Sequence, residues 1–196
     1  MLIDTEKIRT KGVERQKKSS VFIDSSNGDD ITLVLKKKQK INDCFGELQQ
    51  NVTYHFATAG RWSAYELLNY VLSYTGPAEV YFTTWKINDL VAANLFKNIK
   101  AGTITKLYAI LEKRIPVTAP EAKDLVVSNS SKHKITDNHS KVVVVMNNNW
   151  AVVINGSANM TINPRIEAGT LCTKRLVAEF TKKWILNEIE DEKPFG

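Results

Sequence analysis

Two apolar runs separated by three asparagines form the clearest pattern in the chain. Residues 142–146 and residues 150–154 each have the length of a β-strand, and Asn147, Asn148 and Asn149 lie between them. This pattern predicts a β-hairpin, because asparagine tolerates the left-handed backbone that a tight turn needs. Neither run alternates with polar residues, so we expect both strands to be buried on both faces.

From residue 51 up to this hairpin, apolar segments of strand length alternate with segments of helical period. The sequence predicts strands over 54–57, 79–85 and 104–111, and helices over 61–74, 88–100 and 119–127. Asn88 can cap the second of these helices. A polar loop over 128–138 leads to the hairpin. The alternation indicates an α/β fold: a mixed, largely parallel β-sheet flanked by helices on both faces.

After the hairpin, one more strand and one more helix are expected. Residues 166–171 predict the strand, and Thr173 can cap a helix that runs to residue 189. The apolar face of that helix is predicted to contain Leu176, Val177, Phe180, Trp184 and Ile185.

The first 50 residues differ from the rest, and we assign them to a basic N-terminal extension ahead of a domain over 51–196. Residues 21–23 and 31–35 predict two short strands joined by a turn. Residues 1–41 carry ten Lys or Arg and six Asp or Glu, a net of +4 out of +6 for the chain. The extension is either an arm that follows phosphates or a solvated edge hairpin whose lysines discourage strand pairing, and we favour the second.

Composition narrows the class of protein. With 196 residues, 43% of them hydrophobic, the chain can form one domain or one domain plus an extension. A pI near 9.2 permits a polyanionic partner without requiring one. Cys44 and Cys172 are far apart, so no metal site is expected. The chain shows no signal-peptide core and no run long enough to span a bilayer, so we expect a cytoplasmic protein without membrane contact.

Polar residues lie at the ends of the two hairpin strands. His139 and Lys141 are two residues apart at the start of the first strand, so their side chains share a face. Gly156, Ser157 and Asn159 follow the second, antiparallel strand and return to the same end of the sheet. This set suits a phosphate: Lys141 as a point charge, Ser157 and Asn159 as donors, and His139 as nucleophile or proton carrier. Gly156 lets a ligand approach the backbone closely.

The order His-x-Lys followed by Gly-Ser-x-Asn resembles the HKD motif of the phospholipase D superfamily. The family pattern is His-x-Lys, four residues, Asp, six residues, Gly-Ser or Gly-Gly, then Asn and often a later Glu. This chain matches it at His139, Lys141, Gly156, Ser157, Asn159 and Glu167. It departs in spacing, with seven residues after Lys141, and in Asn149, which stands where the family has Asp.

The resemblance implies a function as well as a fold. The family builds its active site from two HKD motifs, and this chain has one, so a homodimer with two facing His139 residues is implied. Short members of this kind are mostly nucleases. One His139 attacks phosphorus and forms a phosphohistidine, and the partner's His139 protonates the leaving oxygen and then activates water. Both Lys141 side chains stabilise the charged oxygens, so neither a metal nor a cofactor is needed.

Three further residues have two readings each. Glu167 either orients His139 through a hydrogen bond or pairs with Arg165 at the surface. Asn149 keeps a hydrogen-bonding group but loses the charge, which is compatible with retained activity and also with a protein that only binds; we place it with the substrate-binding residues. Trp85, at the carboxyl end of a strand, is a candidate wall of the substrate site, although core packing also explains a tryptophan there.

These observations support two functions of different classes. The first is a metal-independent phosphodiesterase, a homodimeric nuclease that acts on nucleic acid, with DNA favoured over RNA. The second is a catalytically weak or inactive HKD-like dimer that binds DNA or RNA. A third possibility is a scaffold whose partner docks on residues 1–50. The sequence leaves open the strandedness of the substrate and any sequence preference.

Overall fold

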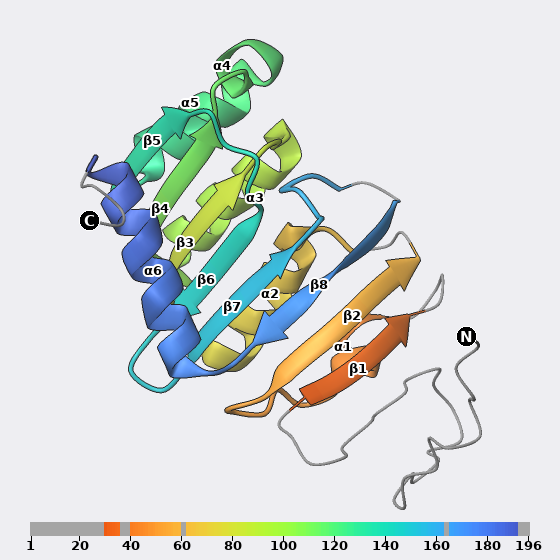
Figure 1. Cartoon of the computed structure of the whole chain (residues 1–196). Coiled ribbons are helices and arrows are strands. Elements are labelled where there is room, and N and C mark those ends of the chain that lie inside the picture. Colours follow the sequence, from red (N-terminus) through yellow and green to blue (C-terminus); the bar gives the residue numbers. More distant parts are fainter. Residues whose placement is uncertain (1–29, 36–39, 60–61, 163–164, 192–196) are drawn as a thin grey trace, which may run out of the picture.

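The computed structural model of the chain describes residues 30–35, 40–59, 62–162 and 165–191, and these form one sheet with helices on both sides (Figure 1). The strands, all in one eight-stranded sheet, are β1 (Asp30–Leu35), β2 (Thr53–Ala59), β3 (Ala78–Thr84), β4 (Ile104–Glu112), β5 (Lys132–Thr136), β6 (Val142–Met146), β7 (Ala151–Gly156) and β8 (Ile166–Cys172). The helices are α1 (Ile41–Phe45), α2 (Ala64–Thr75), α3 (Asp89–Lys100), α4 (Ile115–Thr118), α5 (Pro120–Asn129) and α6 (Arg175–Ile189).

The strand order is β1-β2-β8-β7-β6-β3-β4-β5. The pairs β1–β2, β3–β4 and β4–β5 are parallel, whereas β6 and β8 are antiparallel to both of their neighbours. All the strands except these two therefore point the same way. The predicted mixed, largely parallel α/β sheet is confirmed.

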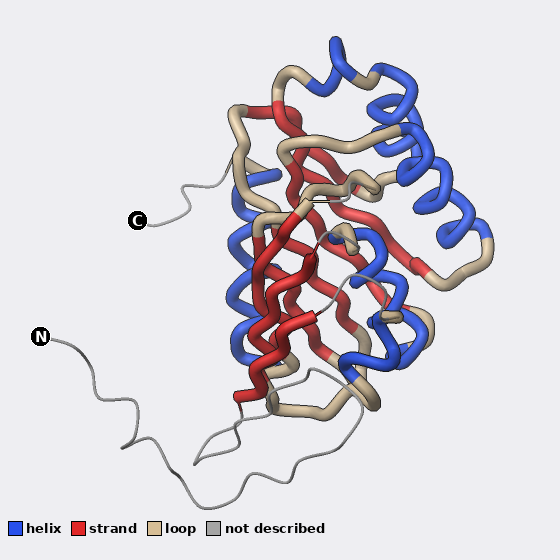
Figure 2. Tube along the Cα trace, turned by 90° about the vertical axis from the view of Figure 1, so that its right-hand side faces the viewer, coloured by secondary structure: helices blue, strands red, loops and turns tan. Residues whose placement is uncertain are grey.

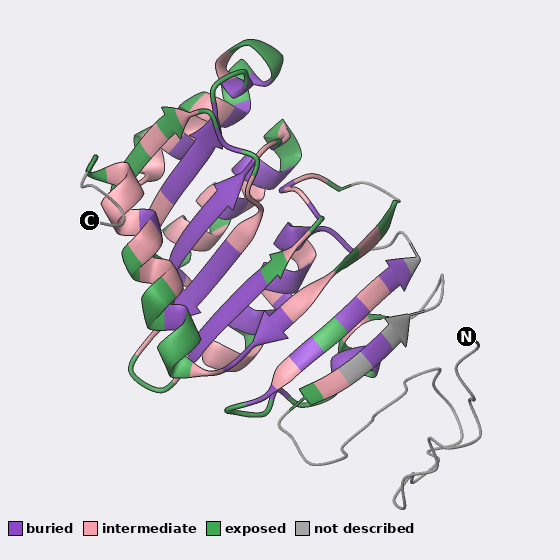
Figure 3. Ribbon diagram, viewed as in Figure 1, coloured by how far each residue is buried: buried purple, intermediate pink, exposed green. Residues whose placement is uncertain are grey.

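Helices cover both faces of the sheet, as predicted. Helix α6 lies on one face, and α1, α2, α3 and α5 lie on the other (Figures 1 and 2). The central strand β6 shows why this arrangement suits an uninterrupted apolar run. Val143 and Val145 pack into the core under α2 and α3, whereas Val144 packs into the core under α6. Figure 3 shows the central strands as buried along most of their length.

The predicted hairpin is formed by β6 and β7, but its turn works differently from the expectation. In the described residues, the only non-glycine residues with positive φ are Asn51 and Asp191, so the turn asparagines do not use left-handed backbone. Instead the Asn147 side-chain oxygen accepts the backbone N–H groups of Asn149 (3.0 Å) and Trp150 (2.8 Å). The turn is therefore closed by a side chain that imitates the backbone.

The polar loop predicted over 128–138 is wrong in part, because it contains strand β5. This strand pairs in parallel with β4 at the edge of the sheet. Its sequence, Lys-His-Lys-Ile-Thr, lacks the apolar alternation that identifies a half-buried strand. Lys134 is held by Glu188 and Asp191 at the end of α6. An edge strand rich in lysine resists pairing with other chains, which explains the misleading composition.

Helix α6 is present, and its predicted apolar face is right in part: Trp184 and Ile185 pack against the core, but Leu176 and Phe180 do not. Ala178 and Ile185 are fully buried, whereas Leu176 is 83% exposed and Phe180 is 63% exposed. Thr173 does not cap the helix, whose N-cap is Lys174. The Thr173 hydroxyl instead accepts the backbone N–H of Val52 (2.9 Å), and this contact ties the chain before α6 to the start of β2.

Part of the predicted N-terminal extension belongs to the sheet and its core. Strand β1 pairs in parallel with β2, and in α1 the side chains of Cys44 and Phe45 are buried. The Phe45 ring lies 5.6 Å from the Tyr54 ring of β2 and 5.7 Å from the Trp62 ring, between ring centroids. The other strand predicted in this region, at 21–23, and the lysines at 36–38 lie outside the described residues.

Candidate functional site

All of the predicted site residues except Asn149 lie at the edge toward which the arrowheads of β3, β4 and β7 point (Figure 1). Antiparallel pairing places Val142, at the start of β6, opposite Asn155 near the end of β7. Gly156 in turn pairs with Gly169 of β8. The structure thus brings His139 and Lys141, just before β6, to the same edge as the residues that follow β7.

His139 and Lys141 are in direct contact. The Lys141 ammonium lies 3.4 Å from Nδ1 of His139 and donates a hydrogen bond to the His139 carbonyl oxygen at 2.7 Å. His139 is exposed, and no hydrogen bond to its Nε2 is found among the described residues. Burial lowers the pKa of Lys141, and the nearby charge of Glu167 opposes this effect by raising it. The arrangement presents one imidazole nitrogen and one ammonium group to solvent.

A network that the sequence did not reveal holds His139 from both sides. The Asn138 side-chain amide donates to the Thr84 carbonyl oxygen (3.1 Å). The Ser140 hydroxyl donates to Thr83 Oγ1 (2.7 Å), which also accepts the backbone N–H of Val142 (3.2 Å). The residues immediately before and after His139 are therefore hydrogen-bonded to the end of β3, and this fixes the position of His139. Such anchoring by neighbours is what a positioned catalytic side chain requires.

Ser157 and Glu167 contact each other across β7 and β8. The Ser157 hydroxyl donates to the Glu167 carboxylate and accepts the backbone N–H of Ala168 at 3.0 Å. The expected hydrogen bond between Glu167 and His139 is not found in the described part of the chain. Glu167 orients Ser157 instead, and its charge acts on Lys141 through space.

Gly156 and Gly169 form a close pair in this part of the sheet. A Cβ atom on Gly156 would lie 2.7 Å from the Ala168 carbonyl oxygen, and one on Gly169 would lie 2.4 Å from the Asn155 carbonyl oxygen. Both contacts are with backbone atoms, which cannot move aside cheaply. Gly156 therefore has a role in strand packing. This role is additional to the one predicted from the sequence, which is to let a ligand approach the backbone.

Two buried polar atoms near this edge have no hydrogen-bond partner among the described residues. They are Oδ1 of Asn159, in the loop after β7, and Oγ1 of Thr58, near the end of β2. The Asn159 backbone is fixed, since its carbonyl oxygen accepts the N–H of Ala64 at the start of α2 (3.3 Å). A buried polar atom without a partner costs stability, so each one in a native fold calls for an explanation.

Trp85, the residue after β3, lies at the centre of the charged groups. Its ring centroid is 5.5 Å from that of His139, 5.8 Å from the Lys141 ammonium and 5.3 Å from the Arg114 guanidinium. Sequence reasoning missed Arg114. One signal was available: Arg114 comes just after the end of the strand at 104–111, and the carboxyl ends of neighbouring parallel strands meet at one edge.

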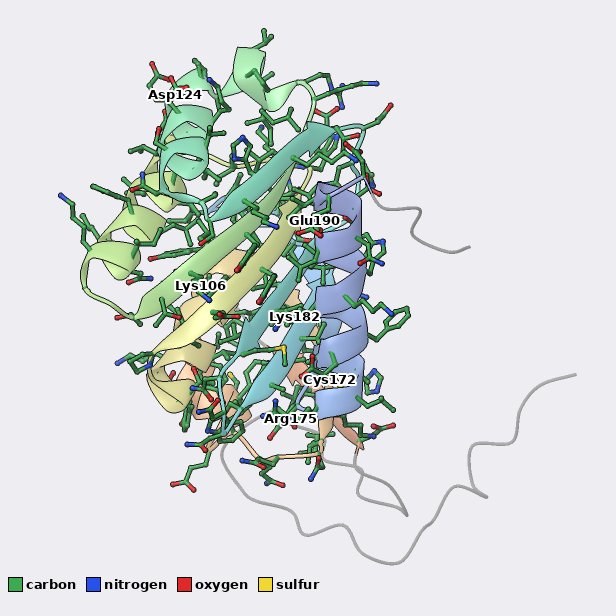
Figure 4. The ribbon with its side chains drawn as sticks, turned by 90° about the vertical axis from the view of Figure 1, so that its left-hand side faces the viewer. Lys106, Asp124, Cys172, Arg175, Lys182 and Glu190 are labelled. Carbon is green, nitrogen blue, oxygen red and sulfur yellow. The ribbon has the colours of Figure 1, made fainter. Side chains whose placement is uncertain are left out.

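Asn149 is not brought to this edge. It lies in the turn between β6 and β7, at the opposite end of both strands from His139. This far end has a solvent-open hollow of about 590 Å³ lined by residues that include Asn149, Arg175 and Lys182. Figure 4 shows Lys106 of β4 and Lys182 of α6 on the side of the sheet that α6 covers. Both lysines pair with Glu79 of β3. The hollow lies at the turn between β6 and β7, at the opposite end of these strands from His139, so it is separate from the candidate site.

The residues that the structure describes contain neither a cluster suited to hold a metal nor a helix suited to span a membrane. No group of three or more His, Cys, Asp or Glu side chains there is arranged to hold a metal ion. None of the helices in that part of the chain is both long enough and apolar enough to cross a membrane.

Comparison with known proteins gives no family. No family model matches the chain, and no curated protein matches its sequence. Solved structures do match, at low similarity. An archaeal chromatin protein, TrmBL2, whose structure shows a novel mode of DNA binding, is 12% identical with a TM-score of 0.48, and the match covers 74% of this chain and 54% of that one.

Two enzymes match to a similar extent. Phosphatidylserine synthase of Haemophilus influenzae is 12% identical with a TM-score of 0.49, over 73% of this chain and 40% of that one. Polyphosphate kinase of Porphyromonas gingivalis is 15% identical with a TM-score of 0.41, over 75% and 24%. The chain thus spans about half or less of these three structures. At these scores the matches assign no activity, so the function is argued from the site.

Proposed function

We propose that this protein is a metal-independent phosphodiesterase of the phospholipase D type, a homodimeric nuclease that cleaves nucleic acid through a phosphohistidine. The observation that carries the proposal is the contact between His139 and Lys141 at the edge where Ser157, Asn159 and Glu167 also lie. A nucleophile beside a cation, with hydroxyl and amide groups nearby, fits attack on a phosphodiester.

The proposed reaction has two steps. In the first, Nε2 of His139 forms a bond to phosphorus, the bond from phosphorus to the leaving oxygen breaks, and the partner's His139 gives that oxygen a proton. In the second, water attacks the phosphohistidine, the partner's His139 takes the proton from water, and the bond from nitrogen to phosphorus breaks. Lys141 offsets the negative charge on the equatorial oxygens in both steps. The Asn159 side-chain amide donates hydrogen bonds to the same oxygens, and the Ser157 hydroxyl does so once it turns away from the Glu167 carboxylate.

Exposed apolar side chains around the site support the homodimer. Leu90 in the first turn of α3 is 56% exposed, Ile162 in the loop after β7 is 50% exposed, and Ile166 at the start of β8 is 83% exposed. A β-bridge between Ile87 and Met160 holds the segment before α3, which leads to Leu90, beside the loop after β7, which contains Ile162. A second copy that packs edge to edge covers these side chains and places a second His139 near the first.

The chemistry of the site favours a polyanionic substrate. The edge carries Lys141 and Arg114 in contact with one aromatic ring, and the chain as a whole has a net charge of +6. A dimer doubles these cations along one edge. A polynucleotide matches such a surface, with DNA favoured over RNA.

A second candidate function is binding of DNA or RNA without turnover. It is favoured by Glu167, which is bonded to Ser157 rather than to His139. A histidine without a carboxylate to orient its ring is a poorer nucleophile, whereas Lys141 and Arg114 bind phosphate whether or not His139 reacts.

The deciding experiment is cleavage of labelled DNA and RNA in excess EDTA by the parent, by His139→Ala and by His133→Ala. His133 is an exposed histidine on β5 and serves as the matched control. We expect cleavage by the parent and by His133→Ala and none by His139→Ala. Retention of cleavage by His139→Ala would refute the proposed mechanism. Salt-sensitive binding by the parent without any cleavage would establish the binding function instead.

The homodimer is tested by mass measurement in solution and by mixing. We expect a dimer whose amount falls when Ile166 is replaced by Asp, together with the activity. A monomeric parent that cleaves nucleic acid would exclude a site shared between two chains.

A further inference from the structure

Arg114 occupies a place beside the His139–Lys141 pair that the proposed mechanism does not use. It lies in the segment between β4 and α4, and its guanidinium carbon is 5.3 Å from the centroid of the Trp85 ring. The Lys141 ammonium lies 5.8 Å from the same centroid. The two cations therefore cannot be farther apart than these two distances added together. Both cations lie against the half-buried ring of Trp85.

A buried carboxylate holds Arg114 in this position. Glu112, the last residue of β4, is 3% exposed. Its two oxygens lie 3.2 Å from Arg114 Nε, and one of them also accepts the Arg114 backbone N–H at 2.8 Å. A carboxylate is expensive to bury unless it is paired and hydrogen-bonded. Glu112 meets both conditions through the side chain and the backbone of one residue, so its location is tied to Arg114.

The hydrogen bonds to Glu112 leave the outer part of the guanidinium unused. The side chain of Arg114 is 61% exposed. Its two terminal nitrogens have no hydrogen-bond partner within the described part of the chain. The pairing with Glu112 uses only Nε of the guanidinium, so it does not account for the two terminal nitrogens. Arginine with free terminal N–H groups is suited to bind two oxygens of one phosphate.

We propose that Arg114, oriented by Glu112 and supported by Trp85, is a second phosphate-binding site, for a phosphate next to the one attacked by His139. The inference rests on the proposed function and names its substrate: a polynucleotide segment with at least two phosphates. Phosphates repeat about every 3.4 Å of axis along one strand of DNA, so neighbouring phosphates can meet the two cations. The site then favours polynucleotides over isolated phosphodiesters.

The test compares two substrates that differ in the number of phosphates. Bis(4-nitrophenyl) phosphate has one phosphodiester, and a single-stranded DNA of about a dozen nucleotides has many. For Arg114→Ala we expect a KM about tenfold higher on the DNA, because one charged hydrogen-bonding partner is lost, and a much smaller change on bis(4-nitrophenyl) phosphate. The slope of log affinity against log salt falls by about one. Glu112→Gln moves the same readouts in the same direction.

Lys100→Ala is the matched control, because Lys100 also lies on an aromatic ring, that of Phe96 at 4.5 Å, but at the end of α3 away from the site. An unchanged KM and salt slope in Arg114→Ala would overturn the proposal, as would an equal loss on both substrates. If the parent cleaves neither substrate, the proposed nuclease function fails. The salt slope for binding the uncleaved DNA then decides the second phosphate site by itself.

Discussion

The ammonium of Lys141 lies 3.4 Å from Nδ1 of His139, and the two residues come from alternate positions just before β6. Attack by Nε2 requires the ring proton on Nδ1, so in the reacting tautomer Lys141 does not donate to Nδ1 and is held by the His139 carbonyl oxygen instead. The contact also means that the protonation of Lys141 affects the histidine. The electrostatic surroundings of Lys141 therefore bear on any reaction at this edge.

The first prediction concerns the pH dependence of cleavage in Glu167→Gln. Burial lowers the pKa of Lys141, and the charge of Glu167 raises it. Removal of that charge lowers the pKa further, so the ammonium is lost at a lower pH. We expect the alkaline limb of the rate–pH profile to shift to lower pH in this variant. A limb that stays in place would mean that Lys141 does not control it.

The second prediction concerns Thr83 as a positioning residue. Its hydroxyl accepts from Ser140 Oγ and from the backbone N–H of Val142, on either side of Lys141. Thr83→Val keeps the shape and removes both contacts, so we expect a lower kcat with little change in KM. The free energy of unfolding should fall by about 1–3 kcal/mol, because a buried donor is left unpaired. Thr83→Ser should restore kcat, and failure of that rescue would argue against positioning.

The third prediction concerns the glycine pair. Gly169→Ala places a Cβ atom 2.4 Å from the Asn155 carbonyl oxygen and 2.9 Å from Gly156 Cα. The strands must separate, so we expect the free energy of unfolding to fall by about 1–3 kcal/mol or more. Chemical denaturation measures the change, and Thr170→Ala at the next position is the control. A loss no greater than that of the control would contradict the close packing.

Much of the fold could be predicted because its signals are local. The uninterrupted valines of β6 require burial on both faces, and the structure provides two cores for them. Asn88 caps α3 as expected, with its side chain accepting the N–H of Val91 at 3.0 Å. Strand β5 escaped prediction because its lysines reflect its place at the edge of the sheet. That place is decided by tertiary pairing with β4 and not by local pattern.

The site could be predicted only where residues share a strand or a hairpin. His139 and Lys141 follow from strand periodicity, and antiparallel pairing brings Ser157 near them. The contact of Glu167 with Ser157 depends on how β8 pairs with β7. Arg114 depends on β4 lying next to β3, and a sequence does not state strand order. Residues that reach the site from non-adjacent segments therefore need the structure.

The fourth prediction concerns Glu79 and acid stability. The Tyr81 hydroxyl donates to Glu79 at 2.5 Å, and this bond, helped by Lys106, lowers the pKa of the carboxyl group. The carboxylate therefore stabilises the fold above its unfolded pKa, and this contribution is lost as pH falls through the folded pKa. We expect Glu79→Gln to be destabilising at about pH 7 and much less so at about pH 3. The exposed Glu47→Gln is the control, and an equal loss at both pH values would contradict the linkage.

The fifth prediction separates the two faces of α6. The predicted apolar face of α6 includes Leu176, Phe180 and Ile185, but Leu176 is 83% exposed and Phe180 is 63% exposed, whereas Ile185 is fully buried. Ile185→Ala should lower the free energy of unfolding by about 2–4 kcal/mol, because a cavity forms under the helix. Leu176→Ala should change it by less than about 0.5 kcal/mol. Thermal or chemical denaturation of both variants makes the comparison. A larger loss for Leu176→Ala than for Ile185→Ala would contradict the packing of the helix through Ala178 and Ile185.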